Sequence, residues 1–209
     1  NPTAIANPDD YSPEDIRGLF VRRFKKDIQH EVATAFQDRQ TLCFRCEATP
    51  AEEAVYAGLA ELAFARLDQR GNGSHLFRTT LEKALFSSPA ACLDTVRNRM
   101  RKLAEEDSPE ARQDLAALAD LGRSLEAVAP SAFGKYQKLL SLLRDEDSGL
   151  HWTGRDAADR LVVFTERIET LAFLRKQLQA DLKLKPEQVE VLHGTLSDVE
   201  QQRIVEDFG

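Results

Sequence analysis

A serine or threonine adjoins a proline at four places in the middle of the chain, and these pairs constrain the fold strongly. They are Thr49-Pro50, Ser88-Pro89, Ser108-Pro109 and Pro130-Ser131. A hydroxyl side chain caps the first free N–H groups of a helix, and proline is tolerated at the first helical position. Apolar residues three and four apart follow each pair, as on the buried face of a helix. We therefore predict a helix after each pair.

A fifth helix is predicted over 74–86, because Gly71-Asn72-Gly73 ends the first helical pattern, which runs over 51–68. The five helices are not copies of one short unit, so the pattern predicts a bundle rather than a solenoid. The residues expected to face its core include Val55, Leu59, Val96, Met100, Leu103, Leu118, Leu125, Phe133, Tyr136, Leu140 and Leu143.

The hydrophobic period changes after a polar linker over 145–159. Residues 161–164 and 189–192 are short apolar runs, typical of strands that are covered on both faces. Helical patterns follow them over 166–180 and 197–208. Strand, helix, strand, helix predicts a parallel βαβα unit. The predicted fold class is therefore mainly α with a small α/β part.

Two parallel strands are too few for a stable sheet. The chain ends at Phe208-Gly209, where a further strand is expected, so we interpret it as part of a larger protein. An unpaired strand edge favours pairing with another chain. We therefore predict either self-association through the region after Arg160 or poor order there.

Charge and cysteine content narrow the class of protein. The net charge of -7 disfavours binding of nucleic acid by bulk attraction, although a local basic strip remains compatible with it. Three cysteines are too few for a disulfide scaffold, so a reducing cytoplasm is expected. Cys43 and Cys46 have C-x-x-C spacing without a second pair, so we predict packed thiols and no metal. No apolar run is long enough to cross a membrane.

Three stretches carry a family resemblance. Residues 160–174 contain an apolar strand that ends in Phe164-Thr165, and residues 191–194 end in His193-Gly194. Residues 19–27 contain the pattern Arg-Arg-x-Lys-x-Asp. Taken in chain order, with 19–27 first, the stretches resemble the Swi/Snf branch of helicase superfamily II, which comprises ATP-dependent double-stranded-DNA translocases. The Ser-Ser-Pro turn at Pro89 is similar to the helical insertion of bacterial members.

The resemblance implies an organisation and a set of DNA contacts. Residues 1–48 would be an inter-lobe connector and strand, 49–147 a helical insertion, and 148–209 part of the second RecA-like lobe. The residues that it places at nucleic acid are Thr165, Arg167, His193, Gly194, Arg22, Arg23 and Lys26. Thr165 would donate its hydroxyl to a phosphate, and Arg23 and Lys26 would reach DNA or a missing first RecA-like lobe.

The sequence lacks the phosphate loop and the acidic magnesium motif that ATP hydrolysis requires. ATP and Mg²⁺ are therefore implied only for the parent protein, and the chain alone is expected to be inactive as an ATPase. The alternative is a helical protein-interaction module that docks a partner such as a polymerase or a nuclease. A second basic strip, at Arg97, Arg99, Arg101 and Lys102, is interpreted as a solvated helix face.

Overall fold

The computed structural model describes residues 41–66, 72–144, 150, 152, 154–156 and 159–208. The chain separates into two compact units, Asn1–Phe44 and Arg45–Gly209. In the first unit only residues 41–44 are described, and they are extended and exposed. The helices of the described residues all belong to the second unit.

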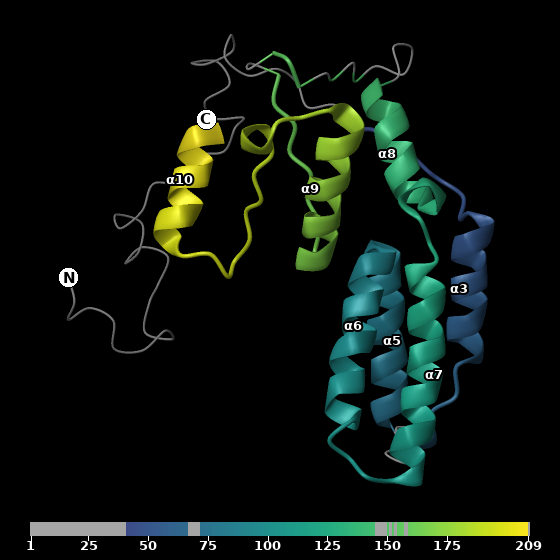
Figure 1. Cartoon of the computed structure of the whole chain (residues 1–209). Coiled ribbons are helices and arrows are strands. Elements are labelled where there is room, and N and C mark those ends of the chain that lie inside the picture. The colour runs from purple at the N-terminus through teal and green to yellow at the C-terminus, as the bar shows by residue number, and fades with distance from the viewer. Residues whose placement is uncertain are drawn as a thin grey trace, which may run out of the picture. The chain divides into compact units, whose positions relative to one another are not determined.

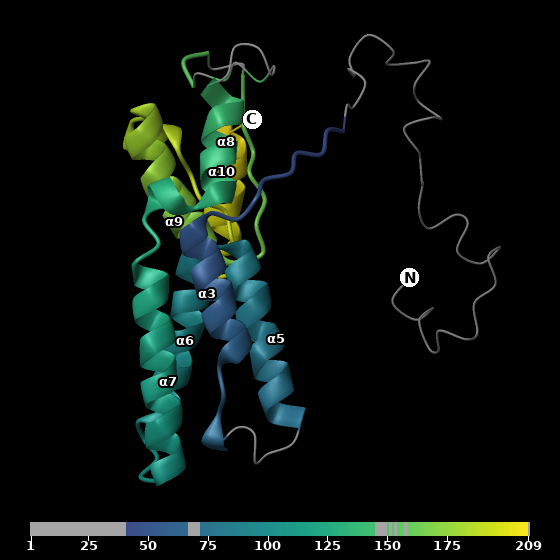
Figure 2. The same ribbon diagram turned by 90° about the vertical axis from the view of Figure 1, so that its right-hand side faces the viewer.

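Four helices of the second unit lie side by side, as Figures 1 and 2 show. They are α3 (Pro50–Glu61), α5 (Asn72–Ser87), α6 (Pro89–Leu103) and α7 (Pro109–Glu126). Helix α6 packs against both α5 and α7, and α3 packs against α7. Their shared core consists of fully buried aliphatic side chains, among them Leu81, Val96, Leu103 and Leu118. Four of the five helices predicted for the bundle thus share one core, whereas the fifth packs in a separate core.

The hydroxyl–proline pairs start three of these helices as predicted. The Ser88 hydroxyl accepts the N–H of Ala91, and the Ser108 hydroxyl accepts the N–H of Ala111, each at 3.1 Å. Thr49 forms a reciprocal cap, in which its hydroxyl accepts the Glu52 N–H and its own N–H donates to the Glu52 carboxylate. Each cap satisfies amides that have no partner inside the helix.

A second, smaller core lies between α8 (Gly134–Arg144) and α9 (Ile168–Leu182). The rings of Phe133 and Tyr136 each pack edge-on against the Phe173 ring, with centroids 5.6 and 5.3 Å apart. Edge-to-face contacts of this kind add to the stabilisation from burial. The prediction that Phe133 and Tyr136 face inward is therefore confirmed.

Hydrogen bonds between distant residues join the start of α3 to the start of α8. The Thr49 hydroxyl donates to the carbonyl oxygen of Ala132 at 2.6 Å, and the Gly134 N–H donates to the buried Glu52 carboxylate at 3.1 Å. The Glu52 carboxylate thus accepts N–H groups from two segments of the chain. A buried carboxylate requires such partners to offset its lost hydration.

Helix α9 also packs on α6, and hydroxyl groups meet at that contact. The Thr170 hydroxyl lies 2.8 Å from that of Ser87 and 2.7 Å from that of Ser88. At the other end of α9, the Tyr136 hydroxyl donates to the Asp181 carboxylate, and Arg144 donates to the Asp181 carbonyl oxygen. Both ends of α9 are therefore attached to other helices.

The last described helix is less well packed. A 3-10 turn (Pro186–Gln188) and an extended segment lead to α10 (Asp198–Phe208). Ile204 is the one buried residue of α10, whereas Val199 and Val205 on the same helix are largely exposed. The α10 helix predicted from the sequence is confirmed, together with its capping pair Ser197 and Glu200.

The predicted α/β part is wrong, because the described residues contain no strand and hence no RecA-like βαβα unit. Residues 161–164 and 189–192 are extended, but no backbone hydrogen bond joins them to each other. The Val189 N–H bonds only to the nearby Pro186 carbonyl oxygen, at 3.4 Å. An apolar run predicts an extended segment correctly, whereas a strand also needs a partner with free N–H and C=O groups. Residues 41–47 are likewise extended without being a strand.

Smaller differences concern single elements. The first helix ends at Glu61 rather than near residue 68, because Leu62 leaves the helical region at φ -60° and ψ 118°. The Asp114 carboxylate, from α7, accepts the Ala65 N–H at 2.6 Å beyond this break. Cys43 and Cys46 are exposed rather than packed. Within the described residues, every helix is too short or too polar to cross a membrane.

Candidate nucleic-acid interface

Two turns lie at the same end of the C-terminal part of the second unit. Residues 160–165 run down to the start of α9, and residues 189–193 run down to the loop before α10, as Figure 1 shows. The two helices thus begin at one end and run back in the same direction. The turns contain four of the residues that the resemblance places at DNA, namely Thr165, Arg167, His193 and Gly194.

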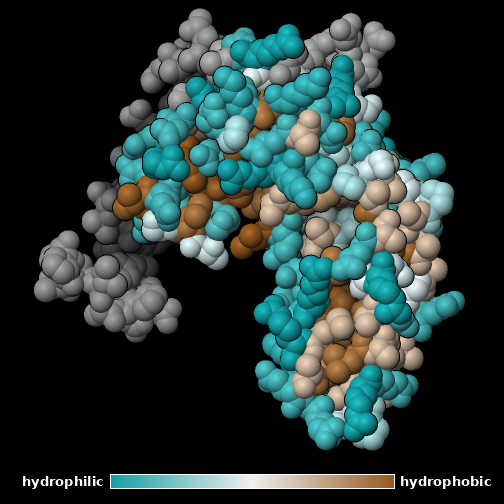
Figure 3. All heavy atoms as spheres, viewed as in Figure 1, coloured by the Kyte–Doolittle hydropathy of each residue, from teal (hydrophilic) through white to brown (hydrophobic). Residues whose placement is uncertain are grey.

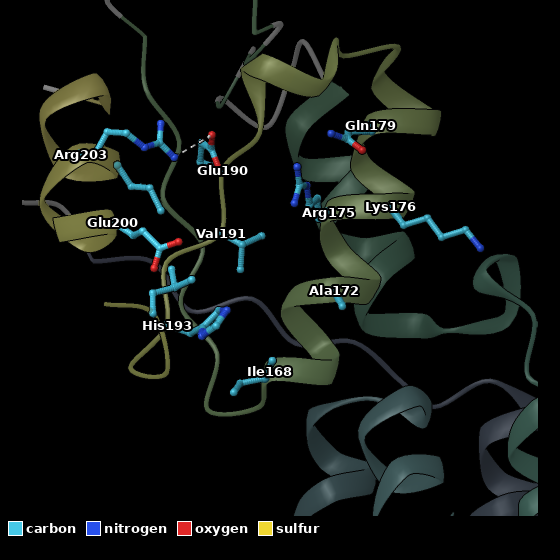
Figure 4. Close-up of a pocket in the computed structure, with 12 residues that line it drawn as sticks. Ile168, Ala172, Arg175, Lys176, Gln179, Glu190, Val191, His193, Glu200 and Arg203 are labelled. Atoms are coloured by element: carbon cyan, nitrogen blue, oxygen red, sulfur yellow. Dashed lines mark ion pairs between the residues drawn. The ribbon is translucent and has the colours of Figure 1, made fainter. Parts of the chain in front are cut away.

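A hollow of about 460 Å³ lies between α9, α10 and the second extended segment. Figure 4 shows Ile168 and His193 near its lower end, with Arg175 and Arg203 higher up on the two helices. Arg203 is paired with Asp207 at 2.8 Å and lies 3.9 Å from Glu190. Because its charge is already balanced by these carboxylates, Arg203 is poorly placed to hold an additional anion.

Thr165 is half-buried and points into the molecule. Its hydroxyl lies 3.3 Å from that of Ser87 and accepts the Arg167 N–H at 3.4 Å. It therefore belongs to the same hydroxyl cluster as Ser88 and Thr170. The sequence indicates a helix cap at Thr165, but it gives no sign of partners from the turn between α5 and α6.

Arg167 is the N-cap residue of α9, and its side chain makes no capping hydrogen bond to the first turn of this helix. Burial raises the pKa of the Cys92 thiol to about 12, and the positive charge of Arg167 opposes this rise. The guanidinium of Arg167 therefore lies within electrostatic reach of the junction between α6 and α9. Its side chain is half-buried.

The His-Gly turn is more open. The Nδ1 atom of His193 lies 2.8 Å from the Thr195 hydroxyl. A Cβ atom added at Gly194 would meet no atom within 4 Å, so packing inside the chain does not require glycine at this position. Open space beside the backbone suits close approach by a ligand, which is one reason for a glycine at a binding turn.

The remaining predicted residues lie elsewhere. Arg22, Arg23 and Lys26 fall outside the described residues. In the second basic strip, Arg97 pairs with Glu126 at 2.7 Å, and the Arg99 guanidinium lies 5.6 Å from the centre of the Phe77 ring. Arg97, Arg101 and Lys102 are exposed, as expected of a solvated face, whereas Arg99 is half-buried.

Sequence reasoning missed the hydroxyl cluster of Ser87, Ser88, Thr165 and Thr170. The Ser-Ser-Pro turn indicated only a helix start, and its partners lie about eighty positions further along.

Among the described residues, no group of three or more His, Cys, Asp or Glu side chains is arranged to hold a metal. Comparison with protein-family models, with curated proteins and with solved structures gives no match.

Proposed function

We propose that this chain is a DNA-contacting part of an ATP-dependent double-stranded-DNA translocase, and that the first turn of α9 binds a backbone phosphate. The observation that carries the proposal is the uncapped start of α9 beside Arg167. ATP and Mg²⁺ act in the parent protein, because the sequence of this chain holds neither a phosphate loop nor an acidic magnesium motif.

The first amides of a helix have no partner inside it, and the helix dipole adds a partial positive charge at this end. At the described starts of α3, α6, α7 and α10 a side chain takes up one of these donors. At α9 the N-cap side chain makes no such hydrogen bond, and the N-cap residue is itself cationic. Glu169 is the one acidic residue of that turn. Free N–H donors next to a guanidinium suit an oxyanion such as a phosphate group.

The start of α10 differs and supports the choice of α9. The Ser197 N–H and hydroxyl both donate to the Glu200 carboxylate, at 3.0 and 2.7 Å. These hydrogen bonds lower the pKa of Glu200, which keeps its negative charge at the helix start. A phosphate would compete there with a carboxylate that is already present. The neighbouring His193-Gly194 turn can still approach DNA through its open backbone.

The attachment of α9 also suits a part that transmits movement. Thr170 joins its first turn to the start of α6, and Asp181 joins its last turn to α8. A phosphate bound at Arg167 would therefore act on a helix that is joined to α6 at its first turn and to α8 at its last turn. In a translocase, such a connection would pass displacement of the duplex backbone to the helical region.

Duplex binding by the 209-residue chain tests the proposal. Fluorescence anisotropy with a labelled DNA duplex at low salt should show binding that weakens as salt rises. Arg167→Ala should weaken duplex binding by about 3- to 10-fold. It should also reduce the slope of log binding constant against log salt concentration by about one. Arg123→Ala is the matched control, because Arg123 is exposed on α7 and pairs only with Asp120. Absence of binding, or equal effects of the two substitutions, would refute the proposal.

A further inference from the structure

A second hollow, which adjoins the first and shares Arg175, Glu190 and Val191 with it, is mainly apolar. Residues 161–164 and 189–192 form its walls together with α9 and α10, and its volume is about 400 Å³. Figure 3 shows apolar residues, in brown, at the surface of the part of the molecule that contains α9 and α10. Sequence reasoning did not predict this hollow, because both runs were expected inside a sheet.

The side chains along the first wall are unusually exposed for their type. Phe164 is 91% exposed, Val162 is 55% exposed, and Leu192 on the opposite wall is 46% exposed. Single exposed apolar residues are common, whereas several together mark a contact surface. Leu161, by contrast, packs against the second core. Residues 161–164 thus pack against the second core through one face and expose apolar side chains on the other face.

The backbone of the same wall also lacks partners. Among the described residues, no backbone hydrogen bond involves residues 161–164. An extended segment with free N–H and C=O groups is an edge to which another strand can add. The exposed apolar side chains and the free backbone groups therefore call for the same kind of partner, which is an extended chain.

We propose that the partner is a second copy of this chain, and that residues 160–166 of the two copies pair antiparallel about Val163. In that register Arg160 of one copy lies opposite Glu166 of the other, and Val162 lies opposite Phe164. The two-fold axis repeats each pair, so two ion pairs flank two apolar pairs. Cross-strand pairs of both kinds stabilise antiparallel strands, and a two-fold contact closes on itself.

The position of Arg160 supports this register. Its guanidinium lies 5.2 Å from the centre of the Phe208 ring, and its side chain remains exposed. Stacking on an aromatic face leaves the edge of a guanidinium free to bind a carboxylate. Glu166 is exposed as well. Both charges are therefore available at the two ends of the segment.

The other possible pairings are less favourable. A parallel arrangement in register would place Arg160 against Arg160 and Glu166 against Glu166, which is repulsive. Antiparallel pairing of 189–193 about Val191 would place Glu190 opposite Leu192 and would leave its charge unmatched. Residues 160–166 are thus the extended segment whose charges complement their own copy.

Charge reversal tests the register by sedimentation equilibrium of the full chain. Arg160→Glu and Glu166→Arg should each weaken dimerisation by about tenfold or more, because each turns two attractive pairs into two repulsive ones. The double variant should restore dimerisation to near the wild-type level. Glu187→Arg, at an exposed position outside the segment, is the matched control and should have little effect. Circular dichroism should show that all variants keep their helix content.

A wild-type chain that stays monomeric at several hundred micromolar would overturn the proposal, and so would a double variant as weak as the single ones. Cross-linking gives an independent readout. In a background with Cys43→Ser and Cys46→Ser, Val163→Cys should form an intermolecular disulfide under mild oxidation, since this position would meet itself across the axis. Val199→Cys is the control, because Val199 is 78% exposed and lies outside the pairing. Equal cross-linking at both positions would also overturn the proposal.

Discussion

The Thr170 hydroxyl lies 2.7 Å from the Ser88 hydroxyl, and this contact joins the first turn of α9 to the residue that caps α6. Both side chains are buried, at 5% and 0% exposure. The Ser88 oxygen already accepts the Ala91 N–H, so the same atom serves a helix start and a contact between helices. Loss of the Ser88 hydroxyl would therefore affect both the start of α6 and its contact with α9.

Removal of the Thr170 hydroxyl should therefore destabilise the fold. In Thr170→Val the hydroxyls of Ser87 and Ser88 lose a partner within a buried site, which costs about 1–3 kcal/mol of unfolding free energy. Thr80→Val is the control, because the Thr80 hydroxyl is exposed and bonds only to Leu76 of its own helix. Urea unfolding measures both variants. Equal losses would show that the cluster contributes no more than a surface hydroxyl.

Removal of a second buried polar group, the Asp114 carboxylate, should also destabilise the fold. The Asp114 side chain is 0% exposed and accepts the Ala65 N–H at 2.6 Å. Asp114→Ala leaves that amide without its acceptor at the break after α3, so we expect a loss of about 1–3 kcal/mol. Asp120→Ala removes an exposed carboxylate from the same helix and should cost under about 0.5 kcal/mol. Chemical unfolding of both variants tests the difference, and an Asp114→Ala variant as stable as Asp120→Ala would contradict it.

The same glycine-to-alanine change should have opposite effects at two positions. A Cβ atom at Gly134 would lie 2.9 Å from the Glu47 carbonyl oxygen and 3.0 Å from the Glu52 carboxylate. Gly134→Ala should therefore displace the buried Glu52 and lower the thermal midpoint. At Gly58, inside α3, an added Cβ meets no atom within 4 Å. Gly58→Ala should stabilise the chain by about 0.5–1 kcal/mol through helix propensity. Calorimetry of the two variants should give shifts of opposite sign.

The three cysteines should differ in reactivity. Burial raises the pKa of Cys92 from 9.0 to about 12, so its thiolate fraction at about pH 8 is roughly a thousandfold below that of an ordinary thiol. Cys43 and Cys46 are exposed. A chromogenic disulfide reagent should therefore label two thiols rapidly in the folded chain and the third only after unfolding in urea. Rapid labelling of all three would contradict the buried position of Cys92.

The same pKa shift implies a pH dependence of stability. Between about pH 9 and pH 12 the folded chain keeps the Cys92 proton while the unfolded chain releases it. Folding is therefore favoured below this range, and stability falls as pH rises through it. Cys92→Ala should lose this contribution. Comparison of urea midpoints for the two proteins at about pH 8 and pH 10 isolates the effect from other alkaline titrations.

Local sequence signals predicted much of the helical part. The caps at Thr49, Ser88 and Ser108 and the inward faces of α6 and α8 depend on residues within one or two turns of each other, so they can be read directly. The contact of Thr170 with Ser88 joins positions 82 apart, and no local pattern records it. The absence of strands has the same origin, because apolar runs at 161–164 and 189–192 specify extended backbone but not its partner. Ile168, an apolar residue in the first turn of α9, is exposed beside the hollow near His193.

The family resemblance selects the residues of the candidate site, and their role at nucleic acid stays a prediction. Thr165, Arg167, His193 and Gly194 lie at two turns at the same end of the C-terminal part of the second unit. The sequence did not show that Thr165 would bond to Ser87, or that α9 would begin without a side-chain cap while α10 has one. Both features depend on which distant groups reach a helix start, and that is decided by tertiary packing.

The attachment of α9 at both ends has a consequence for local opening. Thr170 and Asp181 connect this helix to α6 and α8, whereas α10 buries Ile204 alone. Amide protons of α9 should therefore exchange with solvent together with those of the bundle, by a cooperative opening. Amide protons of α10 should exchange earlier, through a low-energy opening that leaves the rest of the molecule folded.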